Sequence, residues 1–157
     1  MYSQHEYIAT VIWQRRESEK YTDNRYSRAH EWRFDGGVTV PASSSPKSVP
    51  LPMSAENAVD PEEAFVAALS SCHMLFFLFH AAKKGFVVER YEDEALGVMD
   101  KNAQGRMAMV KVTLRPKITW SGDKQPAAEE LLALHEQSHH DCYIANSVSS
   151  DVVIEPR

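Results

Sequence analysis

Residues 60–80 have the sequence DPEEAFVAALSSCHMLFFLFH, and this stretch predicts one long helix at the centre of the fold. Asp60 can cap the N-terminus, Pro61 suits the first helical position, and Glu63 completes a capping-box pattern with Asp60. Gly85 is a natural helix stop, and the two lysines before it favour the C-terminal end of the helix dipole. We therefore expect a helix that begins at Pro61 and ends just before Gly85.

The residues ahead of this helix predict three strands. Residues 7–13 are rich in β-branched and aromatic side chains, and residues 26–34 alternate with a period of two. The sequence DGG at 35–37 tolerates positive φ and is followed by VTV, so we expect a β-hairpin there. The Pro- and Ser-rich segment PASSSPKSVPLP at 41–52 predicts a loop that leads into the helix.

The residues after the helix predict two strands, a second helix and a final strand. Residues 91–99 and 107–120 have the strand pattern, and the turn-rich DKNAQG between them favours a second hairpin. Apolar spacing from Pro126 onward predicts a second helix with Cys142 at its end. Residues 147–154 predict a short terminal strand.

Length and composition limit the class of protein. One core serves a chain of 157 residues, so the order β-β-β-α-β-β-α-β predicts an α+β fold in a single domain over residues 1–157. Hydrophobic residues make up 43% and charged residues 25%, which is typical of globular proteins. The net charge of -5 includes no basic stripe, so we do not expect nucleic acid as a partner.

The sequence also gives an expectation about location. The N-terminal residues lack the pattern of a secretory signal. The apolar run from Ala64 to Phe79 is shorter than the roughly 20 residues that span a bilayer. We therefore expect a cytoplasmic protein that does not bind a membrane.

The two cysteines, Cys72 and Cys142, are too few for a disulfide framework, so a bond between them would be a step of chemistry. Helical spacing places four apolar residues beside Cys72: Phe65, Leu69, Phe76 and Phe79. One interpretation is that Cys72 is a small, inert core residue, because apolar surroundings disfavour a thiolate. The other is a reactive thiolate, which needs a neighbouring cation, and arginine is the best candidate.

The histidines near the cysteines allow further interpretations. His73 points about 100° away from the cysteine before it and His80 lies eight positions on, so we expect both to be core or interface residues with a hydrogen bond each. His135 and His139 stand four apart and could face one metal ion with Cys142, but neither HExxH nor CxxC is present. We expect solvated histidines there and no metal. A Cys/His hydrolase fits the composition but has no catalytic signature.

Two cysteine motifs carry a resemblance to a known family. DPEE at 60–63 precedes the cysteine of ALSSC at 68–72, and a second cysteine follows seventy residues later in DCYIANSV at 141–148. With RYSRAHEWRFDGG at 25–37, these motifs resemble the osmotically induced protein C (OsmC) and organic hydroperoxide resistance family. The resemblance implies an OsmC-like fold with a long central helix on curved antiparallel sheets. It also implies an intertwined homodimer with two sites at its interface.

The resemblance further implies a thiol peroxidase without a metal or organic cofactor. Cys72 would be the peroxidatic thiolate that reduces an organic hydroperoxide, and Cys142 would condense with the resulting sulfenic acid into a disulfide. A dithiol reductant, such as a lipoylated protein, would reopen that bond. Glu62 matches the family's carboxylate that orients an arginine. Arg28 is our choice for this arginine, with Arg33 as the rival.

Helix geometry bears on the role of Glu62. Ten residues at about 1.5 Å rise per residue separate the backbones of Glu62 and Cys72 by about 15 Å, beyond the reach of one carboxylate side chain. Unless the helix bends, Glu62 would serve Cys72 of the partner subunit.

The apolar residues around Cys72 suggest the kind of substrate. Four of them would line a pocket for alkyl or fatty-acid hydroperoxides: Phe65, Leu69, Phe76 and Phe79. The alternative function is a non-catalytic binding protein of the same fold, which would hold a small apolar ligand and use its cysteines only for packing.

Overall fold

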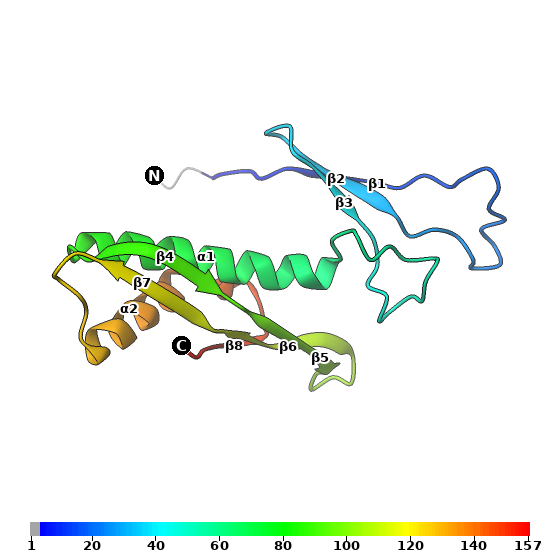
Figure 1. The fold of residues 1–157 in the computed structure, drawn as a ribbon. Coiled ribbons are helices and arrows are strands. Elements are labelled where there is room, and N and C mark those ends of the chain that lie inside the picture. The colour runs from blue at the N-terminus through cyan, green and yellow to red at the C-terminus, as the bar shows by residue number, and fades with distance from the viewer. Residues whose placement is uncertain (1–3) are drawn as a thin grey trace. The chain divides into compact units, whose positions relative to one another are not determined.

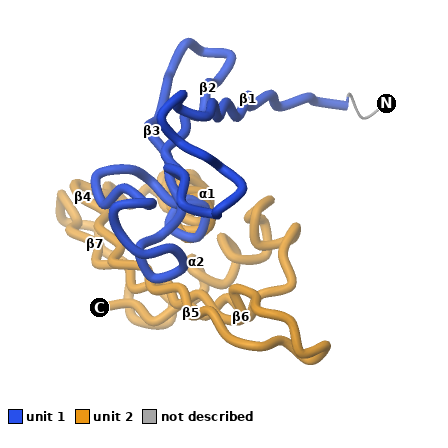
Figure 2. Tube along the Cα trace, turned by 90° about the vertical axis from the view of Figure 1, so that its right-hand side faces the viewer, with its two compact units in different colours: residues 1–64 blue, residues 65–157 orange. Residues whose placement is uncertain are grey.

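The computed structural model of the protein describes residues 4–157. The chain divides into two compact units, with the boundary after Ala64 (Figure 2). Unit 1 comprises the residues up to Ala64, and unit 2 comprises residues 65–157. The single domain expected from the chain length stays a prediction.

Unit 1 contains an antiparallel sheet in the order β1-β2-β3. Its strands are β1 (Ala9–Ile12), β2 (His30–Phe34) and β3 (Thr39–Ala42) (Figure 1). The predicted hairpin is confirmed: Gly37 has φ of 85°, and Phe34 N–H donates to Val38 at 2.9 Å. The following loop is held back onto β3, because Ser43 and Val59 are joined by a backbone hydrogen bond of 3.0 Å.

The central helix, α1 (Pro61–Lys83), has the predicted ends. Asp60 Oδ1 accepts a hydrogen bond from Glu63 N–H at 2.7 Å, and Glu63 Oε2 accepts one from Asp60 N–H at 3.3 Å. The helix ends at Lys83, just before Gly85, which has φ of 76°, and Phe86 N–H donates to the Ala81 carbonyl at 3.0 Å. These are the capping box and the glycine stop that the sequence predicts.

The remaining elements belong to unit 2. They are β4 (Val87–Asp93), β5 (Leu96–Lys101), β6 (Met107–Leu114), β7 (Pro116–Ser121), α2 (Ala128–Asp141), the short 3-10 turn η1 (Ala145–Ser147) and β8 (Asp151–Ile154). Strand β4 pairs with β7, and a three-stranded sheet has the order β5-β6-β8. The pairing is antiparallel except between β6 and β8. The predicted α+β class and order are confirmed, with the strands predicted at 91–99 and 107–120 each divided in two.

Both helices of unit 2 pack on the same face of the β4–β7 pair (Figure 1). A buried cluster joins the second half of α1 to α2 and to the start of β4: Phe77, Ala81, Phe86 and Leu134. A second cluster joins the first half of α1 to β6: Leu69, Val112 and Leu114. The central helix therefore bridges both sheets of unit 2.

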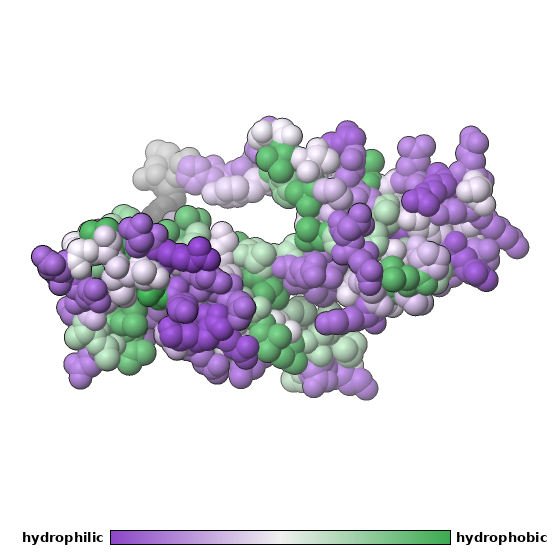
Figure 3. Space-filling view, viewed as in Figure 1, coloured by the Kyte–Doolittle hydropathy of each residue, from purple (hydrophilic) through white to green (hydrophobic). Residues whose placement is uncertain are grey.

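One side of α1 carries exposed apolar residues. Leu75 is 60% exposed and Phe79 is 55% exposed, while Leu69, His73 and Phe77 face the core. The visible surface likewise mixes apolar patches with hydrophilic residues (Figure 3). By length and composition α1 would also suffice to cross a membrane, contrary to the expectation from its apolar run. The core helix of a globular protein passes the same test.

Candidate active site

The structure brings Cys72 and Cys142 together within unit 2. Cys72 lies in the middle of α1, half-buried, and Cys142 directly follows α2 and is 1% exposed. Burial raises the pKa of the Cys142 thiol, and a hydrogen bond with the thiol of Cys72 raises it further. Both sulfurs are free thiols, and their contact places two reducing groups from distant parts of the chain side by side.

Local backbone structure fixes the position of Cys142. Its backbone is extended, with φ of -64° and ψ of 111°, so Cys142 lies outside the helical conformation of α2. Instead, Ala145 N–H donates to the Cys142 sulfur at 3.4 Å, and Asn146 N–H donates to the Cys142 carbonyl at 3.0 Å. An amide N–H aimed at sulfur favours the charged form, but burial outweighs it in the reduced protein.

Two further contacts join α1 to the chain around Cys142. The ring of Phe76 meets the ring of Tyr143 edge to face at 5.0 Å between centroids. His80 Nε2 lies 2.9 Å from Asp141 Oδ2. The expected hydrogen bond of His80 is thereby confirmed. Sequence reasoning missed its partner, although Asp141 is adjacent to Cys142.

A pair of histidines lies in the core beside this site. His73 Nε2 is 3.0 Å from His135 Nδ1, and the two rings are nearly parallel, with 5.3 Å between centroids. Burial lowers the pKa of His73 to about 3 and that of His135 to about 4, so both are neutral at pH 7. His73 is thus the core histidine that the sequence predicts, whereas His135 is buried rather than solvated.

Within residues 4–157, no group of three or more His, Cys, Asp or Glu side chains is placed to hold a metal ion. His135 already faces His73, and His139 Nδ1 is buried without a hydrogen-bond partner among the described atoms.

The predicted arginines and Glu62 belong to unit 1. Arg28 donates to the Asn24 side chain at 2.9 Å, and its guanidinium lies 3.7 Å from the ring centroid of Tyr26. Arg33 is ion-paired with Glu31. Glu62 is half-buried in the first turn of α1.

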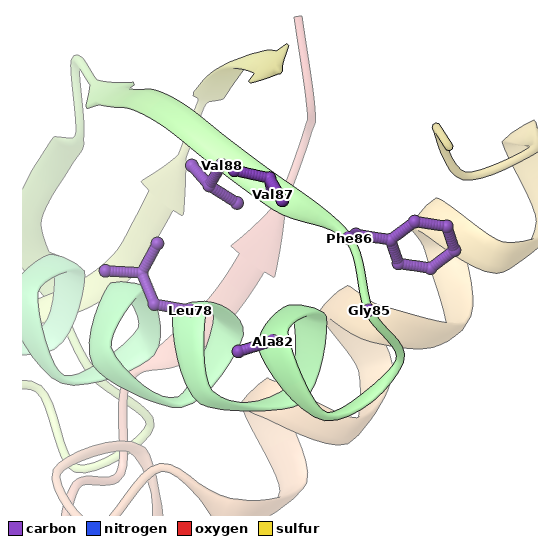
Figure 4. Close-up of a pocket in the computed structure, with 6 residues that line it drawn as sticks. All are labelled: Leu78, Ala82, Gly85, Phe86, Val87 and Val88. Carbon is purple, nitrogen blue, oxygen red and sulfur yellow. The ribbon is translucent and has the colours of Figure 1, made fainter. Parts of the chain in front are cut away.

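The four predicted pocket residues lie in different surroundings within unit 2. Leu69 is a core residue with Phe65 packed against its cluster, Phe76 contacts Tyr143, and Phe79 is exposed. An apolar pocket of about 370 Å³ lies elsewhere, between the end of α1 and β4 (Figure 4). Six residues line this pocket, and neither cysteine is among them: Leu78, Ala82, Gly85, Phe86, Val87 and Val88.

The fold and the site define a class: an α+β protein in which a long central helix carries one free cysteine next to a second at the end of the other helix. The family model described as "OsmC-like protein" matches residues 54–157, about two thirds of the chain. The chain belongs to this family, as the sequence motifs suggested.

Solved structures agree with this assignment. An OsmC-like protein of unknown function from Vibrio cholerae is 52% identical, with a TM-score of 0.97 over 98% of this chain and 100% of that one. An organic hydroperoxide resistance protein of Bacillus subtilis is 18% identical, with a TM-score of 0.69 over 98% of each chain. One from Elizabethkingia anophelis is 17% identical, with a TM-score of 0.70 over 99% and 96%. The last two share the fold. No curated protein matches the chain.

Proposed function

We propose that this protein is a cysteine-based peroxidase that reduces organic hydroperoxides. The observation that carries the proposal is the proximity of the Cys72 and Cys142 thiols, which lie seventy residues apart in sequence. Solved relatives of the same fold are named organic hydroperoxide resistance proteins, which supports the same reaction class. No metal or organic cofactor is needed, because sulfur itself supplies both electrons.

The reaction divides into three steps. The thiolate of Cys72 attacks one peroxide oxygen, the O–O bond breaks, and the alkoxide leaves and takes up a proton to become the alcohol, while Cys72 becomes a sulfenic acid. The Cys142 sulfur then displaces the sulfenic oxygen, which leaves as water, and a Cys72–Cys142 disulfide forms. A dithiol reductant, such as a lipoylated protein, exchanges with this disulfide and returns both thiols.

The roles of the two cysteines follow from their exposure. Cys72 is half-buried and can be reached by a solute, whereas Cys142 is buried, and burial favours its neutral thiol. The more accessible thiol meets the peroxide first. The enclosed thiol reacts only with a sulfur next to it, as a resolving residue should.

Charge pairing favours Arg28 over Arg33 as the residue that stabilises the Cys72 thiolate. Arg33 is paired with Glu31, whereas Arg28 has no ion pair within residues 4–157 and keeps its charge available. We propose that Glu62 orients Arg28. Because α1 is continuous, Glu62 and the cysteine of its own chain are about 15 Å apart along the axis, so the site forms in a homodimer with Glu62 serving Cys72 of the partner subunit.

The proposed substrates have an apolar tail. Phe76 lies one turn after Cys72, and its ring packs on Tyr143, so aromatic surface adjoins the thiols. Phe65 and Phe79 lie within two turns of Cys72 on the same helix, whereas Leu69 is buried in the core and supports this surface from behind. Alkyl or fatty-acid hydroperoxides bury their tails against such surface, whereas hydrogen peroxide gains nothing from it.

Steady-state reduction of cumene hydroperoxide and hydrogen peroxide, with dithiothreitol as the reductant, tests the proposal. We expect turnover with a preference for cumene hydroperoxide, loss of turnover in Cys72→Ser, and sulfenic acid without an internal disulfide in Cys142→Ser. If two thiols persist after peroxide treatment, the alternative of a non-catalytic binding protein is favoured. The pocket between α1 and β4 would then be the place to look for its apolar ligand.

A further inference from the structure

Three successive turns of α1 contact the chain where α2 ends. The residues on α1 are spaced four apart, so they form a row on one face: Cys72, Phe76 and His80. Three consecutive residues lie opposite this row: Asp141, Cys142 and Tyr143. The cysteine contact is therefore one of three contacts between the same two segments.

The contact between His80 and Asp141 differs from the others because it is polar. Asp141 also accepts hydrogen bonds from Gln137 and His140, each at 2.9 Å, but both donors lie on α2 itself. Of the three donors, His80 alone belongs to α1. The bonds from Gln137, His140 and His80 lower the pKa of Asp141 to about 2, so it is a carboxylate at neutral pH. A carboxylate only accepts, so His80 Nε2 carries the proton of this bond.

Cys142 needs such a link because its local hydrogen bonds, from Ala145 and Asn146, join it only to the chain that follows and not to α1. It is the first residue beyond α2, and its backbone is extended. A disulfide forms only when the two Cβ atoms come to about 3.5–4.5 Å, so a small shift of this chain end would slow bond formation. Asp141, the preceding residue, is tied to α1 eight residues beyond Cys72.

We propose that His80 and Asp141 are positioning residues for the resolving step: their hydrogen bond holds the end of α2 against α1, so that the Cys142 sulfur stays within reach of Cys72. This inference deepens the proposed function and rests on it. The step it serves consumes the sulfenic acid of Cys72 and the thiol of Cys142 and yields one disulfide and one water. It needs no further oxidant, since the hydroperoxide has already supplied the oxidation.

Rapid-quench oxidation of the full chain with cumene hydroperoxide separates the two steps. Dimedone traps the sulfenic acid at Cys72, and non-reducing mass spectrometry counts the disulfide at each time. In His80→Ala we expect sulfenic acid to form at the wild-type rate and the disulfide to form roughly tenfold more slowly, because one hydrogen bond to a charged group is lost. Trapped sulfenic acid should accumulate as a result.

The chain offers matched controls. Gln137→Ala and His140→Ala each remove one hydrogen bond from the same carboxylate but leave the link to α1 intact, so both should resolve at the wild-type rate. His80→Gln keeps an N–H donor near the Nε2 position and should restore most of the rate. Asp141→Asn removes the charge with little change in shape and should slow the same step, which provides a second variant if His80→Ala fails to fold.

A peroxide-free measurement separates this inference from the proposed function. Titration with glutathione redox buffers gives the effective concentration of one thiol toward the other. We expect this value to fall roughly tenfold in His80→Ala and to stay unchanged in Gln137→Ala. A wild type inert to hydroperoxides would overturn the proposed function, while this titration would still decide the positioning role. Equal values in wild type and His80→Ala, or an equal fall in Gln137→Ala, would overturn the inference.

Discussion

His73 and His135 meet edge to edge in the core of unit 2, with 3.0 Å between His73 Nε2 and His135 Nδ1 and 7° between their ring planes. One nitrogen of this pair must carry the proton and the other must accept it, so the contact requires that at least one ring be neutral. Burial keeps both neutral, with the pKa of His73 near 3 and that of His135 near 4. The pair couples the stability of the fold to pH.

The first prediction is a loss of stability in mild acid. The folded-state pKa values of the two histidines lie below the unfolded value of about 6.5. At pH values between the folded and unfolded pKa, the unfolded chain therefore binds more protons than the folded chain. This contribution to stability is complete above pH 6.5 and is lost as the pH falls toward 4 and then 3. We expect the free energy of unfolding from urea titrations to fall by about 1 kcal/mol per pH unit for each histidine between pH 6 and 4.5.

His135→Phe tests the source of this slope. It preserves an aromatic ring against Phe77 and removes one titrating group, so the slope should fall by about half. Leu132→Ala, which changes an exposed side chain without a titrating group on the same helix, should leave the slope unchanged. Equal slopes in wild type and His135→Phe would contradict the buried pair as the cause.

The second prediction separates a core role of Leu69 from a role in the pocket. Leu69 is 0% exposed and packs with Val112 and Leu114, so Leu69→Ala should lower the free energy of unfolding by about 2–5 kcal/mol. Leu132→Ala, at a position 55% exposed on α2, should cost far less. Chemical denaturation of both variants measures the difference. An unchanged stability with a raised KM for cumene hydroperoxide would instead make Leu69 a pocket wall.

The third prediction concerns which subunit supplies the Glu62 that acts on a given Cys72. If Glu62 acts on Cys72 of the partner subunit, Glu62→Gln and Cys72→Ser chains, each inactive alone, should complement one another in mixed dimers. A heterodimer then contains one intact site, so unfolding and refolding the two chains together should restore about a quarter of wild-type activity. If Glu62 acts within its own chain, the mixture should stay inactive. Sedimentation of the wild type as an active monomer would equally contradict the shared site.

Local sequence signals predicted the helix ends well. Asp60 and Glu63 form a capping box within four consecutive residues, and Gly85 supplies its own backbone preference. The motifs around Cys72 and Cys142 likewise predicted the family. These features depend on short stretches of sequence, which is why they could be recognised without coordinates.

Long-range contacts explain what the sequence could not predict. The strands expected at 91–99 and 107–120 break where Asp93 accepts hydrogen bonds from Arg115 N–H and from Ser70 of α1, a set of partners that no local pattern reveals. The sequence also could not show which face of α1 points to the core, because the helix has apolar side chains on every face. Only the packing shows that Leu69 is buried and Leu75 exposed.

The central claim is that Cys72 and Cys142 form a redox pair, and mass spectrometry of the peroxide-treated protein under non-reducing conditions tests it most directly. After one equivalent of cumene hydroperoxide, we predict a loss of two mass units from the chain and a proteolytic peptide pair linked through Cys72 and Cys142. Retention of both thiols, or oxidation of Cys72 to sulfinic acid with Cys142 still free, would contradict the claim.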